Sequence, residues 1–182
     1  NSQPQCIPEA DFIDEYNTVY LGSADTPTLY LTFDAGFDNG YHEKILDTLK
    51  EKNVKAAFFV DGNFVKKNPE LVKRMDAEGH LVCNHSLNHP DMTKYTSFSE
   101  YEKQIKGWEE LITQLGLTPR KYFRFPSGRF SEQALEYNEQ LGLTTVFWSF
   151  AYYDWEINNQ PSHEAAKEKI YSRVHNGAVL LL

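Results

Sequence analysis

The sequence predicts an α/β fold built on parallel strands. Short apolar segments rich in β-branched and aromatic residues recur along the chain, and each is followed by a segment with helical apolar spacing. Such alternation joins parallel strands through right-handed helical crossovers. The unusual polar residues also come directly after strand segments, where an α/β barrel carries its functional groups. No glycine-rich phosphate-binding motif follows the first strand, so the barrel is favoured over a nucleotide-binding doubly wound sheet.

Six segments have the composition of strands, and they define the expected frame of the domain. They are residues 29–33, 55–60, 80–83, 122–124, 144–148 and 178–182. The second, KAAFFV, is nearly all apolar, which is typical of a strand buried on both faces. Residues 1–28 are polar, with prolines at 4, 8 and 27, so we expect an N-terminal arm before a domain of residues 29–182.

Five helices are expected between these strands. They are residues 41–49, 69–79, 97–116, 131–142 and 162–177. Ser97 and Glu100 have the spacing of a capping box, and Ser131 and Ser162 stand where an N-cap is expected.

Composition excludes several classes of function. The chain has 182 residues and a formal net charge of −8, so general binding to nucleic acid phosphates is not expected. No apolar run approaches the roughly 18 residues needed to span a bilayer. The chain begins at Asn1 rather than Met, so we expect that a leading segment was removed, which leaves secretion open. Cys83 is expected to be a buried thiol, with a bridge to Cys6 as the alternative outside the cell.

Two histidines form the first candidate site. His85 and His89 follow the third strand and are four residues apart, so a helical turn would place both imidazoles on one face. Two imidazoles so placed can bind one divalent cation. The alternative is a pair of surface histidines that share a turn.

Three more charged residues are expected at the same carboxyl-terminal rim. Asp34 follows the first strand, Arg124 ends the fourth and Asp154 lies just beyond the fifth. Asp34 could act as a general base for a metal-bound water, with Arg124 orienting its carboxylate. The alternatives are a helix N-cap for Asp34 and a structural ion pair for Arg124 and Asp154. The rings of Phe125, Tyr153 and Trp155 could stack on a sugar, although core packing is the alternative for each.

Four motifs in this order resemble those of the NodB-type polysaccharide deacetylases, which form carbohydrate esterase family four. They are LTFD at residues 31–34, HSLNH at 85–89, RFPSG at 124–128 and DW at 154–155. The resemblance extends from about residue 29 to residue 182. Residues 32–41 and 146–160 are also similar to the branch that deacetylates N-acetylmuramic acid to prepare muramic-δ-lactam in the peptidoglycan of the spore cortex.

This resemblance implies a distorted (β/α) barrel that removes acetyl groups from an N-acetylated sugar of peptidoglycan with the help of a metal. It implies that Asp34 is the base, that Arg124 orients it, and that His85 and His89 are metal ligands. It also implies that the backbone N–H of Ser127 stabilises the oxyanion and that Asp154 tunes the catalytic acid.

The resemblance also implies a cofactor, a partner and a location. The cofactor is a divalent metal ion, with zinc preferred and cobalt, nickel or another metal such as iron as alternatives. The partner is a glycan strand of peptidoglycan, and the location is outside the cell or in the cell envelope, with a spore association in this branch. The alternatives are deacetylation of N-acetylglucosamine in peptidoglycan or chitin, and a glycan-binding module without catalytic activity.

The sequence departs from the family pattern at two places. The position after the base commonly holds a second, metal-binding aspartate, and here it is Ala35. The family also places a catalytic histidine directly after a final strand like residues 178–182, where this sequence stops. We therefore expect a chain truncated after its sixth strand, with too few strands to close the barrel. The alternative is a chain that is incomplete as a catalyst.

Overall fold

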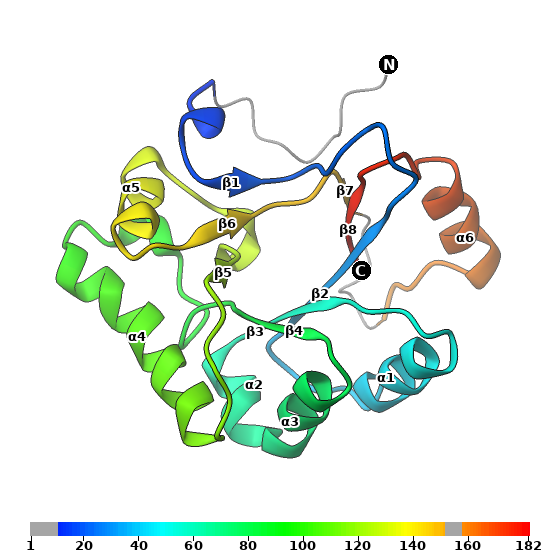
Figure 1. Ribbon diagram of the computed structural model, residues 1–182, viewed down its shortest axis with the longest axis horizontal. Helices are drawn as coiled ribbons and strands as arrows, with labels where there is room; N and C mark the ends of the chain where they lie inside the picture. Colours follow the sequence, from blue (N-terminus) through cyan, green and yellow to red (C-terminus); the bar gives the residue numbers. More distant parts are fainter. Residues whose placement is uncertain (1–10, 152–157) are drawn as a thin grey trace.

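The computed structural model describes residues 11–151 and 158–182. Within these residues the strands form one eight-stranded sheet in the order β1-β6-β5-β4-β3-β2-β8-β7, with parallel pairing throughout. The sheet curls, and the helices lie on its outer side (Figure 1). A bridge between Leu21 and Ala178 links the segment after β1 to the start of β8 across the curl. The predicted α/β architecture of parallel strands is thus confirmed.

All six predicted strands are present, with ends that differ by up to two residues from the expected ones. They are β2 (Tyr30–Ala35), β3 (Ala57–Val60), β4 (Leu81–Asn84), β5 (Tyr122–Phe123), β6 (Thr144–Val146) and β8 (Val179–Leu181). Two further strands were not predicted, β1 (Thr18–Val19) and β7 (Phe150–Ala151). Since β1 pairs with β6, part of the expected N-terminal arm belongs to the sheet. A strand count of six was therefore wrong.

The five predicted helices are also present. They are α1 (His42–Glu51), α3 (Pro69–Ala77), α4 (Phe98–Gln114), α5 (Glu132–Gln140) and α6 (His163–Tyr171). The hydroxyls of Ser131 and Ser162 accept the N-terminal amides of α5 and α6 as expected. The side chain of Ser97 makes no such bond, so the capping-box prediction was wrong. The short helix α2 (Gly62–Lys67) was missed; its N-cap is Asp61, which accepts from the amide of Phe64 at 2.7 Å.

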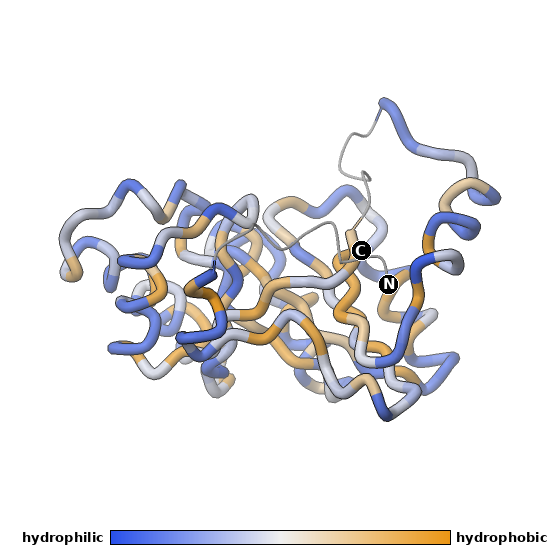
Figure 2. Tube along the Cα trace, turned by 90° about the horizontal axis from the view of Figure 1, so that it is seen from above, coloured by the Kyte–Doolittle hydropathy of each residue, from blue (hydrophilic) through white to orange (hydrophobic). Residues whose placement is uncertain are grey.

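Alternate side chains of β2 face two different sides of the sheet. Leu31, Phe33 and Ala35 pack in the apolar core between the sheet and the surrounding helices. Thr32 and Asp34 point to the inside of the curl, because side chains alternate along a strand. In Figure 2 many hydrophobic stretches of the trace lie in the interior, and hydrophilic stretches prevail at the periphery.

Cys83 lies inside the curl in a small apolar cluster with Phe59, Val146 and Val179. It is a free, buried thiol, as the preferred prediction had it, and burial raises its pKa to about 12. Cys6 lies outside the described residues. In the described part of the chain, every helix is too short or too polar to cross a membrane.

Candidate metal and catalytic site

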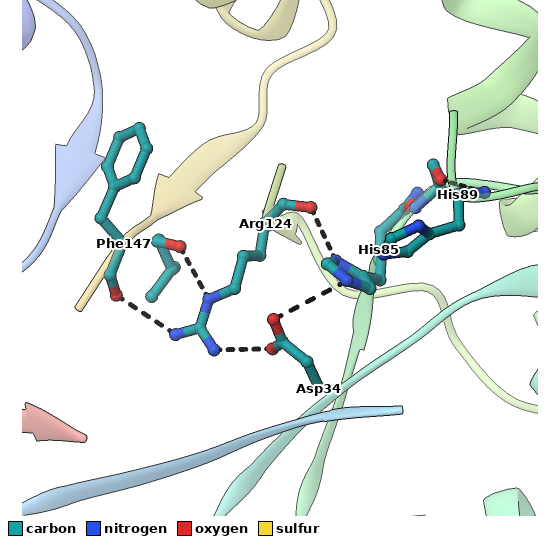
Figure 3. A network of polar contacts seen from close by, with 8 residues as sticks. Asp34, His85, His89, Arg124 and Phe147 are labelled. Atoms are coloured by element: carbon teal, nitrogen blue, oxygen red, sulfur yellow. Dashed lines mark hydrogen bonds and ion pairs between the residues drawn. The ribbon is translucent and has the colours of Figure 1, made fainter. Parts of the chain in front are cut away.

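Three polar side chains converge at the carboxyl-terminal ends of strands of the sheet. Asp34 is the penultimate residue of β2, His85 directly follows β4, and Arg124 directly follows β5. Figure 3 shows Asp34 between the guanidinium group of Arg124 and the ring of His85. The carboxyl ends of parallel strands meet at one rim, which explains why residues 90 positions apart, Asp34 and Arg124, are in contact.

The guanidinium group of Arg124 is fixed by contacts on several sides. Its Nη1 donates to Oδ1 of Asp34 at 2.7 Å, its Nε to the carbonyl of Val146 at 3.0 Å, and its Nη2 to the carbonyl of Phe147 at 3.2 Å. Its central carbon lies 4.1 Å from the centroid of the Phe59 ring. The side chain of Arg124 is fully buried, whereas that of Asp34 is 25% exposed. The Asp34 carboxylate at the rim is therefore oriented. Arg124 binds its Oδ1, and its Oδ2 faces the ring of His85.

The ring of His85 lies on the other side of Asp34. Its Nδ1 is 2.9 Å from the carbonyl oxygen of Arg124, which can only accept, so Nδ1 carries the proton and donates. In the neutral ring Nε2 then has a free lone pair, and this atom lies 3.7 Å from Oδ2 of Asp34. Burial lowers the pKa of His85, which outweighs the opposing effect of Asp34. A neutral imidazole with its other nitrogen held by a carbonyl is the form that binds metals.

His89 completes the imidazole pair, but not through a helical turn. The ring centroids of His85 and His89 are 4.9 Å apart, and the ring planes meet at 68°. The loop between them has positive φ angles at Ser86 (69°) and His89 (55°). The sequence thus predicted correctly that these two rings lie together, while the proposed helical geometry was wrong. That they bind a metal ion stays a prediction.

The donor set fits a divalent cation held by two imidazole nitrogens, with positions left for water and substrate. Among the described residues, no cluster of three or more His, Cys, Asp or Glu side chains is arranged to hold an ion. Ala35 packs in the helix-facing core, on the opposite side of β2 from Asp34. Asp38, another carboxylate in the loop after β2, has its Oδ1 bound to Nδ1 of His42 at 2.8 Å and to the amide of Gly40 at 2.9 Å, and these bonds lower its pKa.

The RFPSG motif continues from Arg124 into a short 3₁₀ turn, Pro126–Gly128. Ser127 is exposed and adopts a left-handed conformation, with φ of 55° and ψ of 16°. The role of its N–H in stabilising an oxyanion stays a prediction. The catalytic role of Asp154 and the substrate contacts of Tyr153 and Trp155 fall on residues outside the described ranges.

The expected stacking of Phe125 on a sugar is corrected by its burial. The ring is fully buried and packs against those of Phe123 and Phe147, with centroid distances of 5.0 and 6.2 Å. A ring with no exposed surface offers a sugar nothing to stack on, so Phe125 supports the rim from beneath. The alternative of core packing describes it better.

Sequence reasoning did not single out Asp61, a buried carboxylate directly after β3 that is only 3% exposed and caps α2. A Cβ added to Gly36, in the loop after β2, would lie 3.0 Å from Oδ2 of Asp61. Its position directly after the apolar run at residues 55–60 was the available signal, since the same rule identified Asp34.

Comparisons with known proteins agree with this fold. Residues 22–146 match the polysaccharide deacetylase family, and the chain belongs to that family. The chain is 44% identical over 170 residues to the peptidoglycan-N-acetylmuramic acid deacetylase PdaA of Bacillus subtilis, covering 93% of this chain and 65% of that protein. It also superposes on the structure of Bacillus subtilis PdaA, a family 4 carbohydrate esterase, with a TM-score of 0.90 and 42% identity, covering 94% of this chain and 73% of the other.

A second kind of relative acts on a different sugar. The chain is 36% identical over 145 residues to a peptidoglycan-N-acetylglucosamine deacetylase of Bacillus cereus, covering 80% of this chain and 52% of that protein. The chain thus spans less than two thirds of the length of these two curated relatives. The predicted family and the deacetylase-type barrel are confirmed.

Proposed function

We propose that the protein is a metal-dependent hydrolase that removes the acetyl group from N-acetylmuramic acid in peptidoglycan. The observation that carries the proposal is the network of Asp34, Arg124, His85 and His89 at one rim of the curled sheet. The choice of sugar is supported by the 44% identity to a protein named for this activity.

Asp34 is the group that would move the first proton. A divalent cation bound by His85 and His89 would polarise the acetyl carbonyl and acidify a water molecule. Oδ1 of Asp34 is occupied by Arg124, so Oδ2, 3.7 Å from Nε2 of His85, is the oxygen free to accept the proton of the attacking water. The water oxygen then forms a bond to the acetyl carbon, the C–N bond breaks, and acetate and a free amine are released.

The remaining roles follow from the charges that this reaction develops. We propose that the N–H of Ser127 donates to the oxygen that becomes negative in the tetrahedral intermediate. Asp154 would hold the group that protonates the leaving amine, and Tyr153 and Trp155 would contact the sugar. Zinc is the proposed metal, with cobalt or nickel as alternatives, since imidazole ligands suit all three.

The proposed substrate also sets the proposed location. Peptidoglycan lies outside the cytoplasmic membrane, so a protein that acts on it works in the cell envelope or after secretion. A role in the spore cortex is part of the proposal through the similarity of residues 32–41 and 146–160 to that branch of the family.

N-acetylglucosamine is the second candidate substrate, favoured by the 36% identity to the Bacillus cereus protein. Peptide-free glycan strands and chitin oligomers should each be incubated with the full-length protein and zinc. Acetate is then measured, and the digested sugars are analysed by mass spectrometry. Loss of acetyl from muramic acid alone is the expected result. Loss from glucosamine would establish the second candidate, and strand binding without acetate release would indicate a glycan-binding module.

A further inference from the structure

The loop that carries His85 and His89 has an unfavourable backbone conformation. Ser86 and His89 both have positive φ angles, 69° and 55°, although neither is glycine. Such conformations persist only where surrounding contacts hold them. Contacts that fix this loop would therefore also fix the distance between the two imidazoles.

Hydrogen bonds hold part of the backbone. The amide of Ser86 donates to Oδ1 of Asn84 at 2.8 Å, and its carbonyl accepts from the amide of Gly62 at 3.0 Å. The amide of His89 donates to the hydroxyl of Ser86 at 2.9 Å. These bonds fix the start of the loop and the turn from Ser86 to His89. The side chain of Leu87, in the middle of the loop, makes an apolar contact instead.

That side chain is Leu87, which lies against two glycines of different helices. A Cβ added to Gly107, in α4, would lie 2.7 Å from Cδ2 of Leu87. A Cβ added to Gly62, the first residue of α2, would lie 2.8 Å from Cδ1 of Leu87 and 2.5 Å from its carbonyl oxygen. Both distances from the leucine methyl groups are shorter than real Cβ contacts allow, so Leu87 occupies a notch that exists only because both residues are glycine.

The placement of Gly107 supports this reading. It lies within the 17-residue helix α4, where glycine is less favourable than alanine, and its φ is not positive. Backbone conformation thus does not require glycine here, whereas the approach of Leu87 does. The wall of the notch is itself fixed, because the indole Nε1 of Trp108 donates to the carbonyl of Val60 at 2.6 Å and Asn84 Nδ2 donates to the carbonyl of Ile105 at 3.3 Å.

We infer that Leu87 is a positioning residue, whose side chain anchors the histidine loop in the notch between Gly62 and Gly107 and so sets the spacing of His85 and His89. For its effect on metal binding the inference rests on the proposed metal site. A leucine that only adds apolar burial would change the stability of the fold and leave the loop geometry and metal affinity unchanged.

The test uses the variants Leu87→Ala, Gly107→Ala and their combination. Each single change should weaken Co²⁺ or Zn²⁺ binding by about tenfold or more, as for other residues that support metal ligands. In the double variant the added methyl group no longer meets the leucine, so its affinity should match that of Leu87→Ala alone rather than fall by the product of both losses. Leu115→Ala, a partly buried leucine packed at the end of α4, is the matched control and should keep the affinity of the unchanged protein.

A second measurement does not depend on the metal. Amide hydrogen exchange at Ser86 and His89 should become faster in Leu87→Ala and in Gly107→Ala, while the amides of α4 stay protected. Unchanged exchange at these two amides would overturn the inference. The unchanged protein could fail to bind metal while exchange at Ser86 and His89 still becomes faster in the two variants. In that case the positioning role stands and the proposed metal site fails. Wild-type metal affinity in both folded single variants would overturn the effect on the metal ligands.

Discussion

Replacing Arg124 by Met should destabilise the fold far more than a surface arginine change does. Methionine keeps much of the side chain's length and can pack against the Phe59 ring, but it removes the cation–π contact of the guanidinium group with that ring and all three donor nitrogens. The carbonyls of Val146 and Phe147 and the Oδ1 atom of Asp34 would each lose a partner. Arg124 joins the ends of β2, β5 and β6 through these bonds, so its loss is felt across the sheet.

The size of the loss follows from these contacts. An orphaned buried acceptor costs about 1–3 kcal/mol, and two backbone carbonyls are affected. Breaking a buried ion pair costs about 3–5 kcal/mol, but the side chain of Asp34 is 25% exposed and can be hydrated in part. Since the new methionine packs against Phe59, we expect a net loss of about 3–5 kcal/mol in the free energy of unfolding. For a chain of this size, that lowers Tm by roughly 6–20 °C.

Urea denaturation followed by circular dichroism measures this loss. Arg129→Met is the matched control, because the Arg129 side chain is 69% exposed and its pair with Asp91, at 3.2 Å, lies near the surface. The control should lose less than about 1 kcal/mol. An Arg124→Met loss no larger than that of Arg129→Met would refute the structural role of the guanidinium group.

The remaining predictions concern three other positions. Asp34→Asn keeps an acceptor for Arg124, so turnover should fall about 10²–10⁴-fold with little change in Tm; near-full activity would require another base. Ala35→Asp would bury a carboxylate in the helix-facing core, so calorimetry should show a lower Tm without tighter metal binding, and tighter binding would contradict the orientation of β2. His80, which accepts the amide of Ala56 at 3.2 Å, has a pKa lowered chiefly by burial. As the pH drops below about 6.5, the unfolded state is protonated at His80 before the folded state, so the free energy of unfolding falls. His80→Asn should therefore lose less unfolding free energy between about pH 7.5 and about pH 5.5 than the unchanged protein. An equal loss would rule out His80 as the source of this pH dependence.

The long, strongly patterned elements were predictable from the sequence, and the short ones were not. The apolar run at residues 55–60 and the apolar spacing of α4 are visible in the sequence alone. The strands β1 and β7 have two residues each, and α2 has six, so none is long enough to show a period. The strands β1 and β7 are held by pairing with β6 and β8, which are distant in sequence, so no local pattern records them.

The convergence of three of the predicted side chains could be read from the sequence, but the geometry of the histidine loop could not. Asp34, His85 and Arg124 were identified together because each follows a strand and parallel strands end at one rim. The loop conformation at His89 was not predictable, because it depends on the notch that Leu87 fills between two helices. Phe125 shows the same limit, since its aromatic character was visible and its burial among Phe123 and Phe147 was not.

The most direct test of the central claim is acetate release from peptidoglycan glycan strands by metal-depleted protein before and after zinc is added. Release by the full-length protein should require zinc, and its His85→Ala/His89→Ala variant should neither bind zinc at one equivalent nor release acetate after zinc addition. Acetate release by the double variant at the rate of the unchanged protein would contradict the assignment of the imidazole pair as the metal site.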